Sequence, residues 1–537
     1  MRTIFKDKNG KPVYVLGLQS HNSSFGCMEL IKKSIAAVKK YHGNTLEVPV
    51  YWYQIQPEEG RFDMSEVRNL IEKVRESGLY LVLLWFGFSK NADSTYLPEW
   101  AKSNPERFRL ARDRDGTVVP MMSPHCRETI EADRRAFVKL ITFLKEFDEG
   151  ERTVIALQVE NEIGFYPIDR CYSQAAQEDF DKGVPECLFD VKLDGSGAPG
   201  QGSSWYDRFG RYAHEAFSSW YFGLAVERIA SAGKAIYPEL PLYMNTMQGE
   251  VRQEIPGQSY SSGSPVARVL DIWKKAAPSI ALFAPDLYCQ PLSAYRRACR
   301  LYGRVDNPLF IPETGTGGDA FAVNLIHAAG DYGAIGICGF GAERTLGPEG
   351  ELTGEARKVA ATMRILESMA PLLLKYGGTD YLFAVSQEEF QKMVHVERTQ
   401  YHVTCEFGNY SRKGSSLWTS LRTDAVLQEY PTVFEERGRG LICETAPDEF
   451  YLAGAGFSAH FLLKAAPDDT YPKRIYSSRA ATELTALTVE EGHFDEAGNW
   501  NCDFVRRGDE NDYGVFVYPG TVVRVKLNPA ACRDVKW

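Results

Sequence analysis

The segment TVIALQVENEIG (Thr153–Gly164) indicates both the fold and the position of a site. Its first part, Thr153–Val159, is largely apolar and shows little alternation, which is typical of a strand buried on both faces of a parallel sheet. The run ends in Glu160, Asn161 and Glu162. Polar groups at the end of a buried strand are costly unless they are used, so this strand end is a candidate site, although a solvated strand end would explain one such motif by itself.

Other short apolar runs have the same texture and alternate with amphipathic helical patterns over roughly the first 370 residues. Eight strands that alternate with helices predict a (β/α)₈ barrel, which we place at residues 1–375. The expected strands are Val13–Leu18, Thr45–Val50, Leu79–Phe86, Thr153–Val159, Pro241–Asn245, Ile280–Ala284, Pro308–Ile311 and Ala334–Cys338.

Two intervals between these strands are long, at about residues 87–130 and 165–205. Both follow the carboxyl end of a strand, the side on which barrel enzymes build their sites. They are either surface decoration or a wall of the substrate site.

The texture changes from about Gln387, where short β-prone runs alternate with turns and helical patterns disappear. This pattern predicts an all-β, sandwich-like C-terminal domain at residues 376–537. We expect structural support as its role, with oligomer contacts or sugar binding as alternatives.

Composition excludes several classes of function. The formal net charge of −10 and the pI of about 5.6 argue against a nucleic-acid partner, which needs a basic face. The N-terminus lacks a long apolar leader and no apolar run is long enough to span a membrane, so we expect a cytoplasmic protein. The 11 cysteines and 9 histidines show no metal-ligand spacing, so neither a metal nor another cofactor is expected.

A second strand end carries another carboxyl group. In NPLFIPETGTGG (Asn307–Gly318), an apolar run leads into Glu313 and a glycine-rich loop. Side chains at the ends of two barrel strands can meet over the barrel axis, and retaining glycosidases need two carboxyls about 5–5.5 Å apart. We therefore predict Glu313 as the nucleophile and Glu162 as the general acid/base, because a neighbouring negative charge raises the pKa of the acid.

These motifs resemble those of glycoside hydrolase clan A. The segment Asn44–Asp63 is similar to the strand-two region of β-galactosidase families 35 and 42, and QVENEIG (Gln158–Gly164) resembles the family 35 acid/base motif. The resemblance covers about residues 10–370, and the remainder resembles a β-rich domain appended in a bacterial subgroup of family 35-like enzymes. It implies a retaining exo-β-galactosidase that acts on a glycoside or small oligosaccharide, with a homo-oligomer left open.

Two departures from the family pattern leave the sugar open. The segment LVLLWFGFSKN (Leu81–Asn91) lacks the sugar-binding Glu of family 35, and Glu47 stands where those enzymes tend to place a Tyr. The alternatives are the same chemistry on an α-L-arabinopyranoside, a β-glucoside or a β-mannoside, or a sugar-binding protein without catalysis.

Several residues near expected strand ends are candidates for substrate binding, with ordinary packing as the alternative for each. Asn161 is expected at the sugar 2-hydroxyl, and Tyr288 is expected to donate a hydrogen bond to the nucleophile. The remaining candidates are Lys90 and Asn91 for hydroxyls, Trp85 for a ring face, Glu47 and Trp52 after strand two, and the weaker Asn22 and Asn245.

Overall fold

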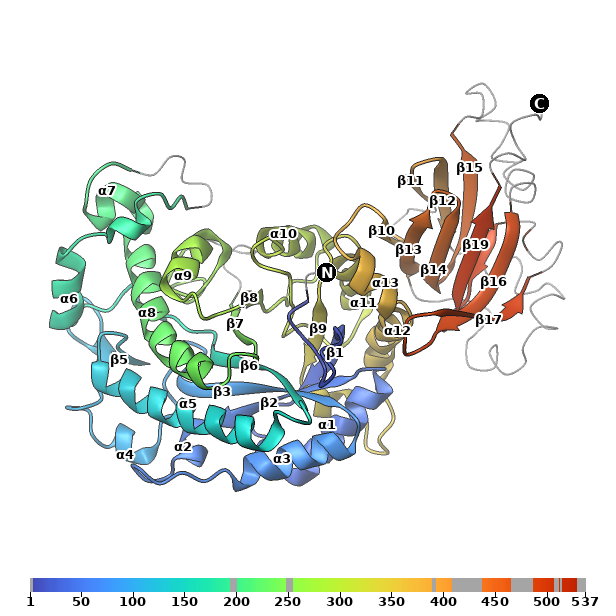
Figure 1. Ribbon diagram of the computed structural model, residues 1–537. Helices are drawn as coiled ribbons and strands as arrows, with labels where there is room; N and C mark the ends of the chain where they lie inside the picture. Colours follow the sequence, from blue (N-terminus) through green and yellow to red (C-terminus); the bar gives the residue numbers. More distant parts are fainter. Residues whose placement is uncertain are drawn as a thin grey trace. The chain divides into compact units, whose positions relative to one another are not determined.

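The structure is a computed structural model that describes residues 3–193, 200–247, 255–388, 393–407, 437–464, 486–506, 511 and 514–528. Its internal contacts divide the chain into two compact units (Figure 1). Arg2–Gly315 and Gly336–Glu351 form the first, called the barrel unit below. Thr316–Ile335 and Leu352–Trp537 belong to the second, called the sandwich unit.

Within its described residues, the barrel unit contains a seven-stranded sheet in the order β8-β7-β6-β3-β2-β1-β9. Every neighbouring pair in this sheet is parallel. Nearly all of its residues are buried, as expected for strands covered on both faces. The strands are β1 (Val15–Gln19), β2 (Thr45–Tyr51), β3 (Tyr80–Lys90), β6 (Val154–Asn161), β7 (Leu242–Thr246), β8 (Leu282–Pro285) and β9 (Gly336–Phe340).

The expected strand Pro308–Ile311 is present only as isolated bridges between β8 and β9. Ile311 donates its N–H to the carbonyl of Gly336 over 3.1 Å, and the N–H of Leu287 donates to the carbonyl of Glu313 over 2.7 Å. Pro308 and Pro312 have no N–H, so a continuous ladder cannot form here. The segment nevertheless takes the remaining place in the ring of strands, and the predicted (β/α)₈ barrel is confirmed.

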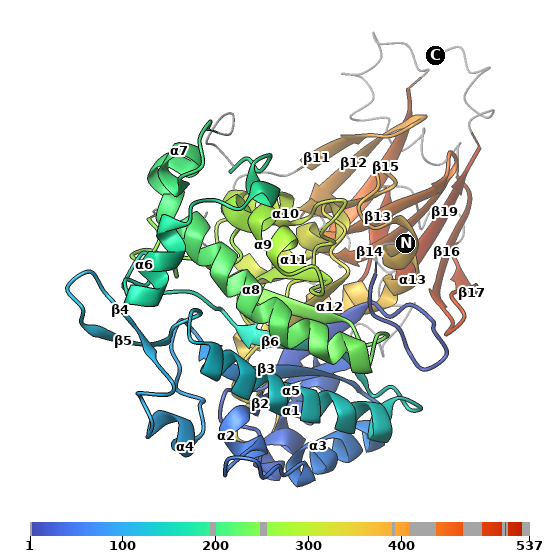
Figure 2. The same ribbon diagram turned by 60° about the vertical axis from the view of Figure 1, so that its left-hand side comes forward.

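Helices alternate with the strands and bury one apolar side. The longest, α5 and α8, lie side by side next to the sheet (Figure 2). Gly233 of α8 permits this close approach, because a Cβ at its position would lie only 2.6 Å from the ring of Phe137 on α5. The helices of this unit are α1 (Met28–Lys40), α2 (Trp52–Ile55), α3 (Ser65–Glu76), α4 (Glu99–Lys102), α5 (Arg127–Asp148), α6 (Gln174–Asp181), α7 (Trp205–Phe209), α8 (Ala213–Ile236), α9 (Leu270–Ala276) and α10 (Leu292–Tyr302), with short 3₁₀ turns at Glu186–Leu188, Gly210–Tyr212, Ala267–Val269 and Ala342–Thr345.

The two long intervals noted in the sequence carry structure of their own. The first contains a small antiparallel hairpin, β4 (Leu110–Arg112) and β5 (Val118–Met122). The second contains α6 and α7 before α8 returns along the barrel. Both leave the sheet at the carboxyl ends of strands, β3 and β6 respectively, and therefore extend the face on which a site is expected.

In its described residues, the sandwich unit contains three helices and two antiparallel sheets, ordered β10-β13-β14-β19-β16-β17 and β11-β12-β15-β18. Side chains from both sheets, such as Val403 and Phe461 on one and Leu452 and Val525 on the other, form a single apolar core. The predicted all-β sandwich is confirmed. The elements are α11 (Asp319–Gly330), α12 (Gly354–Ser368), α13 (Ala370–Tyr376), β10 (Leu382–Ser386), β11 (Met393–Glu397), β12 (Tyr401–Phe407), β13 (Arg439–Ala446), β14 (Glu449–Ala455), β15 (Phe457–Leu463), β16 (Ala486–Phe494), β17 (Trp500–Val505), β18 (Val515–Val517) and β19 (Val522–Leu527).

A buried arginine joins the sandwich to its helices. The guanidinium of Arg439 in β13 donates to the hydroxyl of Thr362 over 2.7 Å and to the carbonyl of Lys358 over 2.8 Å, both on α12. This contact ties α12 to the sandwich. The boundary between the two domains at residue 375 stays a prediction.

Among the described residues, no helix combines the length and the apolar character needed to cross a membrane.

Candidate active site

Polar side chains gather at the carboxyl ends of the barrel strands. Because all of these strands are parallel, their carboxyl ends open onto one face of the barrel. The residues concerned are Gln19 at the end of β1, Lys90 at the end of β3, Asn161 and Glu162 at the end of β6, Asn245 in β7, Asp286 directly after β8, and Glu313 in the bridging segment.

Glu313 is held by a hydrogen bond to each of its carboxylate oxygens. The amide of Gln19 donates to Oε1 over 3.1 Å, and the hydroxyl of Tyr288 donates to Oε2 over 2.8 Å. The side chain of Glu313 is buried, with 6% of its surface exposed. Each donor holds one carboxylate oxygen, so together they orient the side chain of Glu313. Tyr288 donates to Glu313, and its expected role beside a nucleophile stays a prediction.

Glu162 is buried as well but has a different environment. Two causes raise the pKa of Glu162 to about 7. Burial is the larger one, and the negative charge of Glu313 is the second. The charge of Lys90 and a hydrogen bond with Asp286 act in the opposite direction. Glu162 therefore holds a proton near neutral pH while interacting electrostatically with Glu313.

The backbone at this strand end is strained. Glu162 has a φ of 42° and Glu160 a φ of 59°, in the left-handed region that costs non-glycine residues about 1–3 kcal/mol. The side chain of Asn245 compensates, since its Oδ1 accepts a hydrogen bond from the backbone N–H of Glu162 over 2.9 Å. Neighbouring strands thus fix the direction in which the Glu162 side chain leaves the barrel.

Asp286 is a third buried carboxyl that the sequence reading missed. Its Oδ2 accepts a hydrogen bond from the amide of Asn245 over 2.8 Å. Burial, followed by the charges of Glu313 and Glu162, raises the pKa of Asp286 well above its ordinary value. Asp286 directly follows β8, as Glu162 directly follows β6, and it lies two residues after the expected strand Ile280–Ala284, a position that could have identified it. In the part of the chain that the structure describes, no group of His, Cys, Asp or Glu is arranged to hold a metal ion.

Three predicted binding residues are brought together by amide hydrogen bonds. Asn161 accepts from Gln158 and from Asn245, each over 3.1 Å, and donates to Oδ1 of Asn91 over 2.9 Å. The same oxygen of Asn91 accepts from Nζ of Lys90 over 2.8 Å. The amide of Asn161 is therefore already engaged in tying strand ends together, and Lys90 and Asn91 lie beside it.

Trp85 and Trp52 are both fully buried. Trp85 is fully buried and donates its indole N–H to Oδ1 of Asp133 on α5 over 2.8 Å. Its ring lies between β3 and α5, so the predicted role as a platform for a sugar ring does not fit this position. Trp52 is also fully buried, and its indole N–H donates to Gln56 over 3.0 Å.

Glu47 lies inside the barrel beneath the strand ends. It is fully buried, and its Oε1 accepts a hydrogen bond from the hydroxyl of Tyr243 over 3.3 Å. Burial, followed by the charge of Glu313, raises the pKa of Glu47 well above its ordinary value. Glu47 therefore contacts Tyr243 inside the barrel and interacts electrostatically with Glu313. Asn22 lies after β1 and accepts a hydrogen bond from the hydroxyl of Tyr51 with its carbonyl group.

A second pair of buried carboxyls lies behind the site. Asp133 on α5 accepts from Trp85 and from the N–H of Phe88, each over 2.8 Å, while Glu160 accepts from the N–H of Ser89 over 2.8 Å. Burial and then the neighbouring Asp133 raise the pKa of Glu160 well above its ordinary value, and burial raises that of Asp133 to about 6. The pair fixes the end of β3, which carries Lys90.

Two families match this chain. Residues 24–190 match the glycoside hydrolase 42 family, described as beta-galactosidase. Residues 359–518 match a family described as a domain of unknown function, DUF5597. The first match covers β2, β3 and β6, including Glu162 but not Glu313.

Several known proteins are similar to parts of this chain. β-Galactosidase BbgII of Bifidobacterium bifidum is 28% identical over 138 residues, which are 25% of this chain and 19% of that protein. Among solved structures, β-galactosidase from Bacillus circulans sp. alkalophilus has the same fold, with a TM-score of 0.51 and 15% identity over 70% of this chain and 58% of that one. The catalytic domain of β-amylase from Paenibacillus polymyxa gives a TM-score of 0.49 and 14% identity over 65% of this chain and 98% of that one.

The chain thus spans little more than half of the galactosidase structure that it resembles, and its aligned part is about a fifth of the curated relative. Residues 24–190 nevertheless resemble glycoside hydrolase family 42, and β2, β3 and β6 within this segment belong to the barrel.

Proposed function

We propose that this protein is a retaining exo-β-galactosidase in which Glu313 is the nucleophile and Glu162 the general acid/base. One observation carries the proposal, namely the contrast between these two buried carboxyls. Glu313 accepts a hydrogen bond on each of its carboxylate oxygens, whereas the pKa of Glu162 is raised to about 7. Pairs of carboxyls in such different environments are typical of glycosidase acid/base assignments.

In the first half-reaction, a carboxylate oxygen of Glu313 attacks the anomeric carbon. The bond from that carbon to the leaving oxygen breaks, and Glu162 transfers its proton to this oxygen. Gln19 and Tyr288 hold the attacking carboxylate in one orientation before the reaction begins. The result is a glycosyl ester on Glu313 and a free leaving group.

In the second half-reaction, Glu162 becomes the base. Esterification removes the negative charge of Glu313, which is one of the two causes that raise the pKa of Glu162. The charge of Lys90 remains and favours the carboxylate form of Glu162. Glu162 then takes a proton from water, whose oxygen attacks the anomeric carbon and releases Glu313 with net retention.

The site also contains buried acceptors that suit a polyhydroxylated ligand. Among the described residues, Oε1 of Gln19, Oδ1 of Asn22 and Oδ1 of Asp286 are buried without a hydrogen-bond donor. Buried acceptors are normally satisfied, so the hydroxyl groups of a bound sugar are fitting donors. Carboxyl groups around them disfavour an acidic sugar. The choice of galactose is supported by the family match and by the names of the similar proteins.

The test is hydrolysis of aryl glycosides followed by NMR. We expect cleavage of an aryl β-galactoside with the β-anomer of galactose as first product, and a 2-deoxy-2-fluoro sugar trapped on the peptide that contains Glu313. A panel with aryl β-glucoside, β-mannoside and α-L-arabinopyranoside decides which sugar is preferred. Glu72→Gln, an exposed residue of α3, is the control for Glu162→Gln and Glu313→Gln. Inverted product, or full activity in both glutamine variants, would contradict the assignment.

A further inference from the structure

A cavity in the barrel unit is lined by none of the carboxyl groups around Glu313. Its volume is about 510 Å³, within the range of small-molecule sites. Four separate segments line it, one from each of the two long intervals, one at the start of α8 and one after β7. They are residues 113–115 in the turn between β4 and β5, 167–172 after β6, 211–215 at the start of α8, and 255–258.

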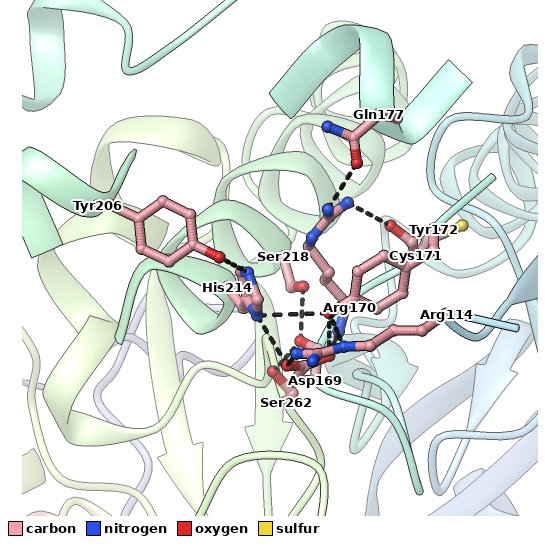
Figure 3. A network of polar contacts seen from close by, with 10 residues as sticks. All are labelled: Arg114, Asp169, Arg170, Cys171, Tyr172, Gln177, Tyr206, His214, Ser218 and Ser262. Atoms are coloured by element: carbon pink, nitrogen blue, oxygen red, sulfur yellow. Dashed lines mark hydrogen bonds and ion pairs between the residues drawn. The ribbon is translucent and has the colours of Figure 1, made fainter. Parts of the chain in front are cut away.

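The wall of this cavity is organised around Asp169, as Figure 3 shows. Arg114 donates to Oδ2 of Asp169 over 3.0 Å, and Nδ1 of His214 lies 2.7 Å from the same oxygen. The hydroxyl of Tyr172 donates to Oδ1 of Asp169 over 2.8 Å. Partial burial by itself would raise the pKa of Asp169. The hydrogen bonds from His214 and Tyr172 are the main opposing causes, and the pKa is lowered overall. The wall is therefore pre-organised in the absence of a ligand.

Further contacts fix the outer side of the same wall. The hydroxyl of Tyr206 lies 2.6 Å from Nε2 of His214. The guanidinium of Arg170 lies 3.9 Å from the centre of the Tyr172 ring and donates to Gln177 over 2.7 Å (Figure 3). Each polar group here is oriented by a neighbour, which lowers the entropic cost of binding a ligand.

The chemistry of the lining favours a neutral polyhydroxylated ligand. Four carboxyl groups, among them Asp113 and Asp115, stand beside Arg114, Arg211 and His214, so the lining presents charges of both signs. Apolar surface from Pro256 and other residues of the same lining lies between these polar groups. A sugar presents hydroxyls that both donate and accept together with apolar C–H faces, and this lining offers a partner for each.

The cavity is connected by the chain to the proposed acid. Its lining begins at Pro167, five residues after Glu162. Between them, Phe165 and Ser262 exchange backbone hydrogen bonds of 2.8 Å in both directions, which fixes the path of this loop. In the proposed reaction, Glu162 delivers its proton to the leaving oxygen, and the loop that follows Glu162 in the chain leads from this acid to the cavity.

We propose that this cavity is a second saccharide-binding site, which holds a sugar unit in the leaving-group part of an oligosaccharide substrate. The inference rests on the proposed function for the direction of the substrate, but the cavity and its polar wall do not. On this proposal, the long intervals after β3 and β6 recognise an oligosaccharide rather than a monosaccharide glycoside.

The experiment compares a long and a short substrate. Arg211→Ala with Gln258→Ala removes two exposed polar groups of the lining and leaves the contacts of Asp169 intact. We expect KM for β-1,4-linked galactotetraose to rise about tenfold, with kcat and KM for an aryl β-galactoside within about twofold of wild type. Arg61→Ala, an exposed arginine paired with Glu58, is the matched control. Equal changes for both substrates, or no change for galactotetraose, would overturn the proposal.

Calorimetric titration separates this inference from the proposed function. Galactotetraose is titrated into the full chain carrying Glu313→Gln, with and without Arg211→Ala and Gln258→Ala. We expect the double substitution to weaken binding about tenfold. If the wild type cleaves no glycoside, the proposed function fails. Titration of galactotetraose into the wild type and into the double variant then tests the saccharide site by itself. Weaker binding then still supports a saccharide site, and an unchanged Kd rules it out.

Discussion

The hydroxyl of Tyr288 donates a hydrogen bond of 2.8 Å to Oε2 of Glu313, on the carboxylate whose Oε1 is held by Gln19. The two donors come from different strand ends, so the orientation of Glu313 depends on the barrel as a whole. Tyr288 is nevertheless 44% exposed, and its side chain therefore stands where a ligand would be in contact with it.

Replacing Tyr288 by Phe removes one donor and keeps the ring. A hydrogen bond to a charged group contributes about 1.5–3 kcal/mol, which corresponds to about 10–100-fold in rate. We expect kcat/KM on an aryl galactoside to fall by this factor with an unchanged melting temperature. Tyr381→Phe, an exposed tyrosine of the sandwich unit, is the control. An unchanged kcat/KM for Tyr288→Phe would show that this contact does not assist the nucleophile.

The pH dependence follows from the raised pKa of Glu162. The first half-reaction needs its protonated form, so activity is present below a pKa of about 7 and is lost as the pH rises through it. Because the charge of Lys90 lowers the pKa of Glu162, Lys90→Met moves this alkaline limb to higher pH. Profiles of kcat/KM from pH 4 to 10 measure the shift, with the exposed Lys39→Met as control. A limb that moves to lower pH would exclude this electrostatic coupling.

Much of the fold could be predicted because apolar runs report burial. The expected strand Thr153–Val159 corresponds to β6 (Val154–Asn161), and the expected Ala334–Cys338 to β9 (Gly336–Phe340). The weak point was Pro308–Ile311, where Pro308 lacks the N–H that a ladder requires. An apolar run shows that a segment is buried but not how its backbone groups are paired.

The site could be predicted only in part, for a related physical reason. Strands of a parallel barrel are buried on both faces, so their sequence does not tell which side chains face inward. Trp85 in fact faces α5, whereas Glu47 faces the barrel interior. Gln19 directly follows the expected strand Val13–Leu18, and Asp286 lies two residues after the expected strand Ile280–Ala284. Applying the strand-end rule to every strand would have included both.

Asp286 tests whether the third carboxyl is protonated. Its raised pKa means that Asn closely imitates its neutral form, so Asp286→Asn should keep kcat/KM within about tenfold. Asp286→Leu should cost about 1–3 kcal/mol in stability, because it removes the acceptor for the buried amide of Asn245. Kinetics and chemical unfolding of both variants measure this difference. Equal losses in the two variants would mean that the charge of Asp286, not its hydrogen bonding, is required.

The pair formed by Glu160 and Asp133 makes stability depend on pH. In the unfolded chain, both carboxyls lose their protons near pH 4, whereas in the folded state burial keeps protons on the pair to a higher pH. The folded state therefore binds more protons in this window, and stability falls as the pH rises through it. Glu160→Gln removes this titration while keeping an acceptor for the N–H of Ser89. Between pH 5 and pH 9, we expect the melting temperature of the variant to fall by a few degrees less than that of wild type, as measured by calorimetry. Glu72→Gln should follow the wild-type curve, and a Glu160→Gln curve parallel to wild type would show that the pair holds no extra proton.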